Sequence, residues 1–236
     1  MKNLIIILSL IFLPLGIQAQ NFIGAWEGYH ISEKDQKLKT IVIFSDEYQV
    51  MSRYDAASGQ FIMTNGGTWK VDGDTVTETV EFDSNNPERV GTQISFKVII
   101  TDTTLSIVDS DMQLKRIDTG APGKLQGAWL MSGRVRNGKT QQRDINKPRK
   151  TMKILSGTRF QWIAYNTKTK QFMGTGGGNY TTIDGKYTEN IEFFSKDNAK
   201  VGLELTFDFS LVDEKWNHSG FSSKGDPIYE IWSLRK

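Results

Sequence analysis

The chain of 236 residues contains no cysteine, which excludes disulfide scaffolds, thiol nucleophiles and thiolate metal sites. It has only two histidines, His30 and His218, too few for a metal site built from several imidazoles. The 29 basic and 27 acidic side chains nearly balance, so the sequence predicts no nucleic-acid partner, which would need a broad basic face. Because no recognisable catalytic motif is present, we expect a protein that is not an enzyme and holds no metal.

Long apolar runs are also missing, except at the start of the chain. Lys2 precedes an apolar segment over residues 4–15, and Ile17-Gln18-Ala19 has the small residues of a cleavage site. The run is short for a bilayer span, so residues 1–19 are predicted to be a secretory signal peptide rather than a membrane anchor. With no cysteine to carry a lipid, we expect the mature protein in the periplasm or outside the cell, without a lipid anchor or a transmembrane segment.

What the sequence does contain is an internal repeat. The motif Gly24-Ala25-Trp26 returns as Gly127-Ala128-Trp129, 103 residues later, and Arg116 is matched by Arg235, 119 residues later. The order of the matches is kept while the offset changes twice, by eight residues each time, so we predict two homologous domains at residues 20–118 and 124–236 with a linker at 119–123. Matches at an offset of 111 residues are Lys39 with Lys150, Glu78 with Glu189, Glu81 with Glu192, and Val90 with Val201.

Each repeat has the alternating apolar and polar pattern of β-strands. In the first repeat the predicted strands are 24–31, 38–44, 47–54, 60–71, 75–82, 91–101, 103–108 and 111–117, with a bend at Gly66-Gly67. Short connections alternate with longer polar ones, which is typical of an up-and-down antiparallel sheet whose tight turns gather at one end. We therefore predict an all-β protein made of two tandem small antiparallel up-and-down β-barrels, with about eight strands each.

A Gly-x-Trp on the first strand and an arginine on the last resemble the lipocalin family of the calycin superfamily. In that family the tryptophan closes one end of the barrel and the arginine packs across its ring. The resemblance therefore implies that Trp26 contacts Arg116 and that Trp129 contacts Arg235, at the end of each barrel with tight turns. Residues 187–193, followed by Val201-Gly202, are similar to secreted bacterial lipocalin-like proteins of uncharacterised function. No activity comes with this resemblance.

The second repeat has a basic insertion at the predicted open end, within residues 135–152. One interpretation is a lid that attracts an anionic, lipid-like ligand, and the other is a solvated loop. The side chains that would form such a lid are Arg136, Lys139, Arg143 and Arg149.

Two matching carboxylates, Glu78 and Glu189, fall on the apolar faces of their strands. They are either polar anchors in a ligand cavity or structural groups, unless both strands face the opposite way. The aromatic residues Trp162 and Tyr187 either line or fill the second barrel. Because Val50 and Thr75 are the smaller counterparts in the first repeat, the first barrel is the roomier candidate, although the basic insertion points to the second.

The leading prediction is non-catalytic binding of a small apolar or amphipathic molecule at the open end of a barrel. The alternative is a cell-envelope module with filled barrels that contacts a protein or a glycan. No cofactor is expected, and haem ligation by His218 is a less favoured reading than an ordinary hydrogen-bonding role for that residue. The oligomeric state is left open.

Overall fold

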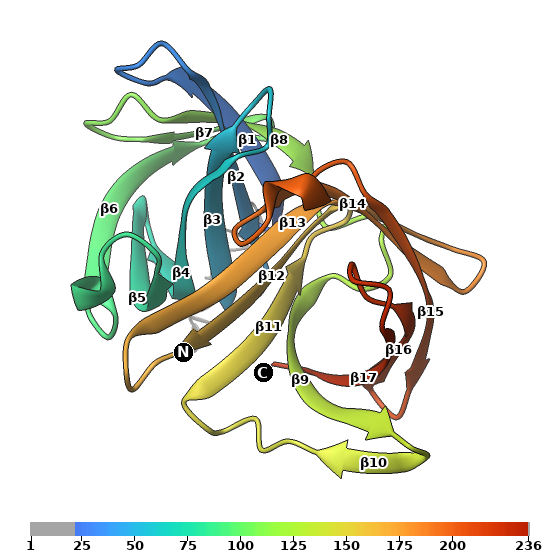
Figure 1. Ribbon diagram of the computed structural model, residues 1–236. Helices are drawn as coiled ribbons and strands as arrows, with labels where there is room; N and C mark the ends of the chain where they lie inside the picture. Colours follow the sequence, from blue (N-terminus) through green and yellow to red (C-terminus); the bar gives the residue numbers. More distant parts are fainter. Residues whose placement is uncertain (1–21, 236) are drawn as a thin grey trace, which may run out of the picture.

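The protein consists of two closed antiparallel eight-stranded β-barrels in tandem, which lie side by side (Figure 1). The computed structural model describes residues 22–235, so the predicted signal peptide at 1–19 lies outside the described residues. Apart from one added strand in the second barrel, neighbouring strands follow chain order, as in the up-and-down barrels that the connection lengths predicted. Within residues 22–235 there is no helix of the length and apolar character needed to span a membrane.

The first barrel contains eight strands and one short 3-10 helix. They are β1 Gly24–Ile31, β2 Lys37–Phe44, β3 Tyr48–Asp55, β4 Phe61–Asp72, β5 Thr75–Asp83, η1 Pro87–Arg89, β6 Gln93–Ile100, β7 Thr104–Ile107 and β8 Gln113–Asp118. These bounds agree with the predicted strands to within two residues.

The second barrel repeats this order and adds one strand. Its elements are β9 Gly127–Arg136, β10 Lys139–Gln142, β11 Arg149–Leu155, β12 Arg159–Asn166, β13 Gln171–Ile183, β14 Lys186–Phe194, η2 Asn198–Lys200, β15 Glu204–Val212, β16 Lys215–Phe221 and β17 Pro227–Leu234. Strand β10 was not predicted. It forms a hairpin with β9 through Asn137-Gly138, where both φ angles are positive, as a two-residue hairpin turn requires.

The predicted bend at Gly66-Gly67 is a β-bulge. The register between β4 and β5 shifts there, and the register between β13 and β14 shifts at the matching Gly177-Gly178. A Cβ atom at Gly67 would lie 1.9 Å from the carbonyl oxygen of Thr79, so only glycine allows this close approach. The bulge therefore belongs to the repeated architecture.

The expected tryptophan–arginine contact is present in the first barrel. The Arg116 guanidinium lies 3.9 Å from the centroid of the Trp26 ring, and Arg116 Nε donates to the carbonyl of Asp102 in a tight turn at 2.6 Å. The contact therefore lies at the end with tight turns, where the resemblance placed it.

The matching contact between Trp129 and Arg235 was a wrong expectation. Trp26 pairs with Arg116 across β1 and β8, whereas Trp129 pairs with Leu234 across β9 and β17. Arg235 therefore follows, by one residue, the position on the last strand that lies opposite Trp129. Because successive side chains of a strand point to opposite faces of the sheet, Arg235 points away from Trp129. Its guanidinium lies 4.0 Å from the Tyr48 ring of the first barrel, and Trp129 packs against Trp216 instead.

Three hydrophobic clusters hold the molecule together: one inside each barrel and one between the barrels. In the cluster between the barrels, Tyr54 stacks on Phe193 at 4.8 Å and Tyr165 packs on Phe82 at 4.9 Å. Both tyrosine hydroxyls donate at 2.6 Å to a glutamate of the other barrel. Because these pairs match at the repeat offset, the barrels meet much as the subunits of a two-fold dimer do.

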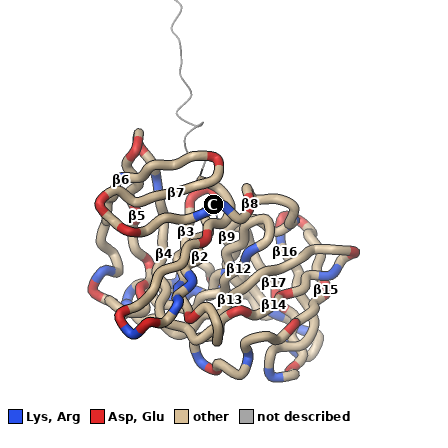
Figure 2. The backbone as a smooth tube through the Cα atoms, turned by 90° about the horizontal axis from the view of Figure 1, so that it is seen from above, with Lys and Arg blue, Asp and Glu red and all other residues tan. Residues whose placement is uncertain are grey.

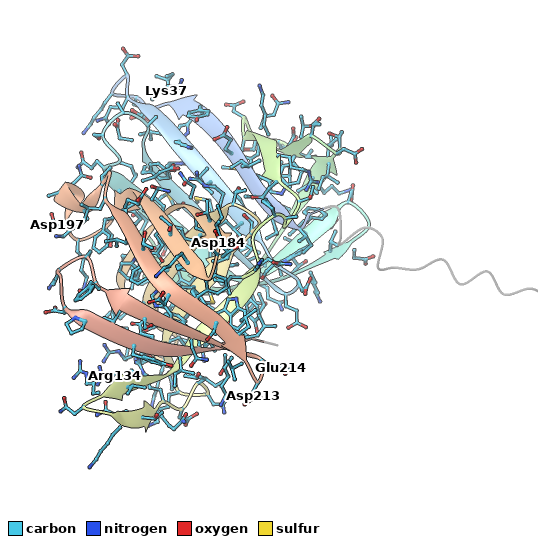
Figure 3. All side chains as sticks on the ribbon, turned by 90° about the vertical axis from the view of Figure 1, so that its right-hand side faces the viewer. Lys37, Arg134, Asp184, Asp197, Asp213 and Glu214 are labelled. Atoms are coloured by element: carbon cyan, nitrogen blue, oxygen red, sulfur yellow. The ribbon has the colours of Figure 1, made fainter. Side chains whose placement is uncertain are left out.

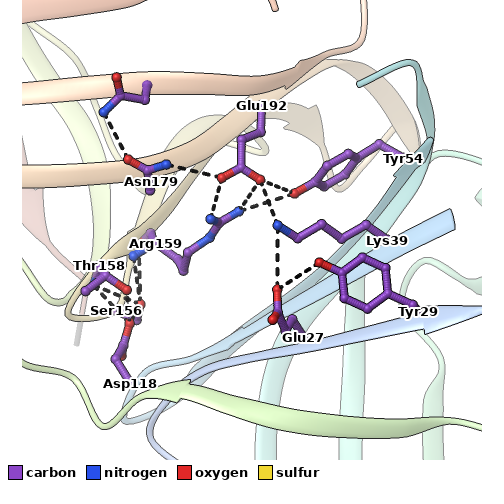
Figure 4. A network of polar contacts seen from close by, with 11 residues as sticks. Glu27, Tyr29, Lys39, Tyr54, Asp118, Ser156, Thr158, Arg159, Asn179 and Glu192 are labelled. Atoms are coloured by element: carbon purple, nitrogen blue, oxygen red, sulfur yellow. Dashed lines mark hydrogen bonds and ion pairs between the residues drawn. The ribbon is translucent and has the colours of Figure 1, made fainter. Parts of the chain in front are cut away.

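The polar part of this interface centres on Glu192 (Figure 4). Its carboxylate accepts hydrogen bonds from Arg159 of its own barrel, at 2.8 Å from Nη2, and from Lys39 of the first barrel, at 3.1 Å. Burial alone would raise the pKa of Glu192, but the hydrogen bonds and charge of Arg159 outweigh it and hold the pKa well below its usual value. The carboxylate is thus charged over the whole ordinary pH range.

The segment between the barrels, residues 119–123, is anchored rather than free to swing. Asp118 at the end of β8 accepts hydrogen bonds from Ser156 Oγ at 2.8 Å and from the backbone N–H groups of Gly157 and Thr158 at 3.1 and 3.0 Å (Figure 4). The first barrel thereby caps a turn of the second, which fixes how the two are joined.

Replacing Glu192 tests this interface. Glu192→Gln leaves the buried Arg159 without its carboxylate, so the free energy of unfolding should fall by about 3–5 kcal/mol in urea denaturation at pH 7. The control Glu88→Gln breaks only the exposed pair with Lys170 and should cost less than about 1 kcal/mol. Equal losses in the two variants would contradict the account of the interface.

Candidate functional site

The interior of the first barrel contains a cavity of about 290 Å³. Most of its wall is apolar, and four polar side chains reach it: Gln49, Asn65, Glu78 and Arg89. The apolar residues that line it are Val42, Phe44, Met51, Val76, Ile94, Phe96, Leu105, Ile107, Met112 and Leu114. A mostly apolar pocket with a few converging polar groups is the usual form of a small-molecule site.

The cavity reaches the end of the barrel with the long connections. Arg89 belongs to η1, in the connection between β5 and β6, and Met112 immediately precedes β8. A second hollow of about 330 Å³ adjoins it, is lined by residues 28–31 and 110–114 among others, and shares Met112 and Leu114 with the cavity. The predicted open end is therefore where the interior comes closest to solvent.

The cavity exists because the first barrel has small side chains where the second has large ones. Val76 is the strand partner of Phe96, and Tyr187 is the strand partner of the matching Phe207, so Val76 and Tyr187 occupy the same position in the two barrels. In the same way, Met51 occupies the position of Trp162. The sequence comparison had used Val50 and Thr75 instead, each one residue off. Further matches from the register are Leu105 with Trp216, Leu114 with Trp232, Gln49 with Phe160, and Ile107 with His218.

These exchanges leave the second barrel filled. Tyr187, Trp216 and Trp232 are at most 1% exposed and pack on one another, with Tyr187 5.1 Å and Trp232 5.7 Å from Trp216. Trp162 is partly buried beside Phe194 at 5.4 Å. Of the two alternatives for these aromatic residues, filling holds: Tyr187 belongs to the core of the second barrel, and Trp162 packs against that core.

Glu78 is the least satisfied polar group of the cavity. It is 5% exposed, and its Oε1 atom has no hydrogen-bond partner among the described residues. Burial raises the pKa of Glu78 to about 7, although the charge of Arg89 and a hydrogen bond from Gln49 oppose this increase. Arg89 itself is bound to Asp83, with Nη1 2.8 Å from Oδ2.

Glu189, the match of Glu78, is fully paired inside the second barrel. Its Oε1 atom accepts from Lys153 Nζ at 2.6 Å and from the Tyr187 hydroxyl at 2.8 Å. Both glutamates thus lie inside their barrels, which excludes the case in which both strands face the opposite way. They differ in their partners, because the strand register places Val42 where the second barrel has Lys153.

The basic insertion does not form a wall of either interior. Its first part extends β9 as the β9–β10 hairpin, with Arg136 and Lys139 exposed, while Arg143 Nη1 contacts Met131 Sδ at 2.7 Å. Arg149 and Arg143 border only a small hollow of about 10 Å³. Figure 3 shows nearby Arg134 at the opposite end of the barrel from the tight turn Asp213-Glu214. These basic side chains do not line the cavity of the first barrel.

His218 is enclosed in the core of the second barrel. It is 1% exposed, and its ring lies 4.1 Å from Phe207 and 5.3 Å from Trp216. Burial lowers the pKa of His218, and the nearby Lys153 adds to this effect, so the ring is neutral at pH 7. Rings packed this closely do not fit a haem group beside the imidazole.

Positions of basic and acidic residues are interspersed along the backbone of the two barrels (Figure 2). Among the described residues, no cluster of three or more His, Asp or Glu side chains is arranged to hold a metal ion. The chemistry available in the cavity is therefore that of one carboxyl group, one guanidinium group and two amides.

Sequence reasoning found Glu78 but missed the residues that set its environment. Gln49 and Arg89 were not selected, because a single polar residue near a strand end carries no motif. One signal in the sequence could have revealed the partner of Glu189. Lys153 interrupts the apolar run of residues 152–155, at the position where the first repeat has Val42.

The fold and this site define a two-barrel protein with a cavity inside its first barrel. A family profile described as a domain of unknown function (DUF4488) matches residues 124–234, which span the second barrel. No curated protein matches the chain. Among solved structures, the crystal structure of the Cpx pathway activator NlpE from Escherichia coli is similar at 11% identity, over 90% of this chain and 94% of that chain, with a TM-score of 0.26. A similarity this weak carries no argument about fold or function.

The pKa of Glu78 makes the stability of the protein depend on pH. Below about pH 4.5 the carboxyl is protonated in both folded and unfolded chains, but between pH 4.5 and about 7 only the unfolded chain ionises. The wild type should therefore lose up to about 3 kcal/mol of stability over this interval through Glu78. Glu78→Gln should lack this loss when unfolding by urea is compared at pH 4, 6 and 8.

The matched control for this comparison is Glu88→Gln, which removes an exposed carboxylate close to the same end of the barrel. Its stability should follow the wild type at each pH. If the difference in free energy of unfolding between Glu78→Gln and wild type is the same at pH 4 and pH 8, Glu78 is not the group that titrates in this interval.

Proposed function

We propose that the protein is a non-catalytic binding protein that holds a small apolar or amphipathic molecule inside its first barrel. The observation that carries the proposal is the cavity of about 290 Å³, with mainly apolar walls and one buried, incompletely bonded carboxyl group. The apolar walls favour a hydrocarbon body, and Glu78 favours a polar end group.

The volume limits the size of the molecule. At about 30 Å³ for each water-sized group, 290 Å³ corresponds to roughly ten such groups. This fits a medium-chain aliphatic molecule better than a long-chain lipid.

The second barrel supports a different role within the same proposal. Its interior is packed with aromatic side chains, as the alternative with filled barrels expects. The alternative of a module that contacts a protein or a glycan therefore applies to this half.

We further propose membership of the calycin superfamily from the resemblance of the first and last strands, and export from the pattern at residues 1–19.

Filling the cavity tests the proposed function. Leu105→Trp places in the first barrel the residue that fills the second at Trp216, so the Kd for octan-1-ol should rise at least tenfold in isothermal titration calorimetry. The control Ile99→Trp adds the same ring to a side chain that is 64% exposed and should leave the Kd unchanged. Equal binding by both variants and wild type would place the site elsewhere, and failure of wild type to bind any eight-carbon probe would contradict the proposal.

A further inference from the structure

We infer that the ligand of the first barrel is a small amphipathic amine whose protonated amino group pairs with Glu78. This inference rests on the proposed function and specifies the chemical class of the ligand. It is drawn from a comparison of the two barrels, because the second contains within its own chain the group that the first lacks.

The second barrel shows which group satisfies a carboxylate at this position. The Lys153 ammonium lies 2.6 Å from Glu189 Oε1 and is surrounded by the rings of Tyr187, Trp216 and Trp232, with centroids at 4.9, 5.1 and 5.5 Å. Both charges are nearly excluded from solvent, with side chains 7% and 5% exposed. At this position of the second barrel, the buried carboxylate is thus paired with a primary ammonium on an aliphatic chain.

The first barrel keeps the carboxylate and removes this ammonium. Trp26 pairs with Val42 as Trp129 pairs with Lys153, so Val42 and Lys153 occupy the same position in the two barrels. Val42 and Glu78 both line the cavity. The space that a lysine side chain crosses in the second barrel is therefore part of the binding cavity in the first.

The second donor to this carboxylate is removed as well. The Tyr187 hydroxyl, which donates to Glu189 at 2.8 Å, is matched by Val76, which has no donor. Glu78 Oε1 thus loses both hydrogen-bond donors that its counterpart has. An ammonium group brings three donors and a positive charge, and so replaces the two lost contacts at once.

The charges around the cavity favour a cationic ligand over an anionic one. The charged groups near Glu78 are Arg89 and Asp83, and Arg89 is already bound to Asp83 at 2.8 Å. With Glu78 ionised, these three groups carry one net negative charge. A protonated amine balances this charge, whereas a carboxylate ligand would place two like charges side by side.

The remaining walls suit an aliphatic body. Leu105 and Leu114 stand where the second barrel has Trp216 and Trp232, so most of the aromatic cage around the Lys153 ammonium is replaced by aliphatic surface and open volume. The cation in the first barrel therefore depends on Glu78 rather than on aromatic rings, and the chain fills the space that the rings give up.

The test compares three eight-carbon probes that differ only in their end group: octylamine, octan-1-ol and octanoate. Isothermal titration calorimetry is done with the full folded protein at pH 8, where an alkyl amine remains protonated and Glu78, with its pKa of about 7, is ionised. Octylamine should bind at least tenfold more tightly than octan-1-ol, and octanoate more weakly than either. Lowering the pH to 6 should raise the Kd for octylamine at least threefold and leave the Kd for octan-1-ol unchanged.

Two variants assign the effect to Glu78. Glu78→Gln should raise the Kd for octylamine at least tenfold, while the Kd for octan-1-ol stays within threefold of the wild-type value. The exposed control Glu88→Gln should change neither Kd. Val42→Lys supplies the internal ammonium of the second barrel and should abolish octylamine binding. The circular dichroism spectrum checks the fold of each variant, and Glu78→Gln decides the question should Val42→Lys not fold.

The outcomes separate the two proposals. Equal or tighter binding of octan-1-ol, or octylamine binding that Glu78→Gln leaves intact, overturns the amine assignment while the proposed function stands. Tighter binding of octanoate likewise overturns it in favour of an anionic ligand. Failure of all three probes to bind wild-type protein overturns the proposed function together with the inference.

Discussion

A carboxylate inside an apolar barrel needs a donor, and this constraint shapes both halves of the protein. The second barrel meets it with its own Lys153 and Tyr187, which bond to Glu189 within 2.8 Å and are packed among aromatic rings. The first barrel keeps the carboxylate as Glu78 and has Val42 and Val76 in place of those donors. One half is therefore a completed interior, and the other is an interior that a ligand would complete.

The way the barrels are joined makes this division of roles physically reasonable. Matching tyrosines and glutamates of the two repeats bond across the interface. The buried Arg159, which donates to the Tyr54 hydroxyl, and the anchored Asp118 fix the second barrel against the first. The cavity removes packing contacts from the first barrel and so reduces its stability. The shared interface lets the densely packed second barrel stabilise the first.

Sequence patterns predicted much of the fold and less of the site. Strand alternation and connection lengths predicted the eight strands of the first barrel, because both depend on local periodicity. The Trp26–Arg116 contact was expected from the lipocalin resemblance instead. The contact of Trp129 with Arg235 failed by a single residue, since the sequence matches do not fix the register of the last strand. The comparison of side-chain sizes between the repeats favoured the first barrel as the roomier one, and the cavity lies there. The shape of the cavity and the partners of Glu78 depend on distances between strands that are far apart in sequence, and no local pattern encodes these distances.

The central claim is that the first barrel binds and the second does not, and methyl NMR tests it most directly. In a titration with octylamine, the methyl resonances of Val76, Leu105 and Leu114 should shift, because these residues line the cavity. Those of Leu155 and Ile191, in the core of the second barrel, should stay in place. Shifts in the second barrel alone, or in neither barrel, would contradict the account.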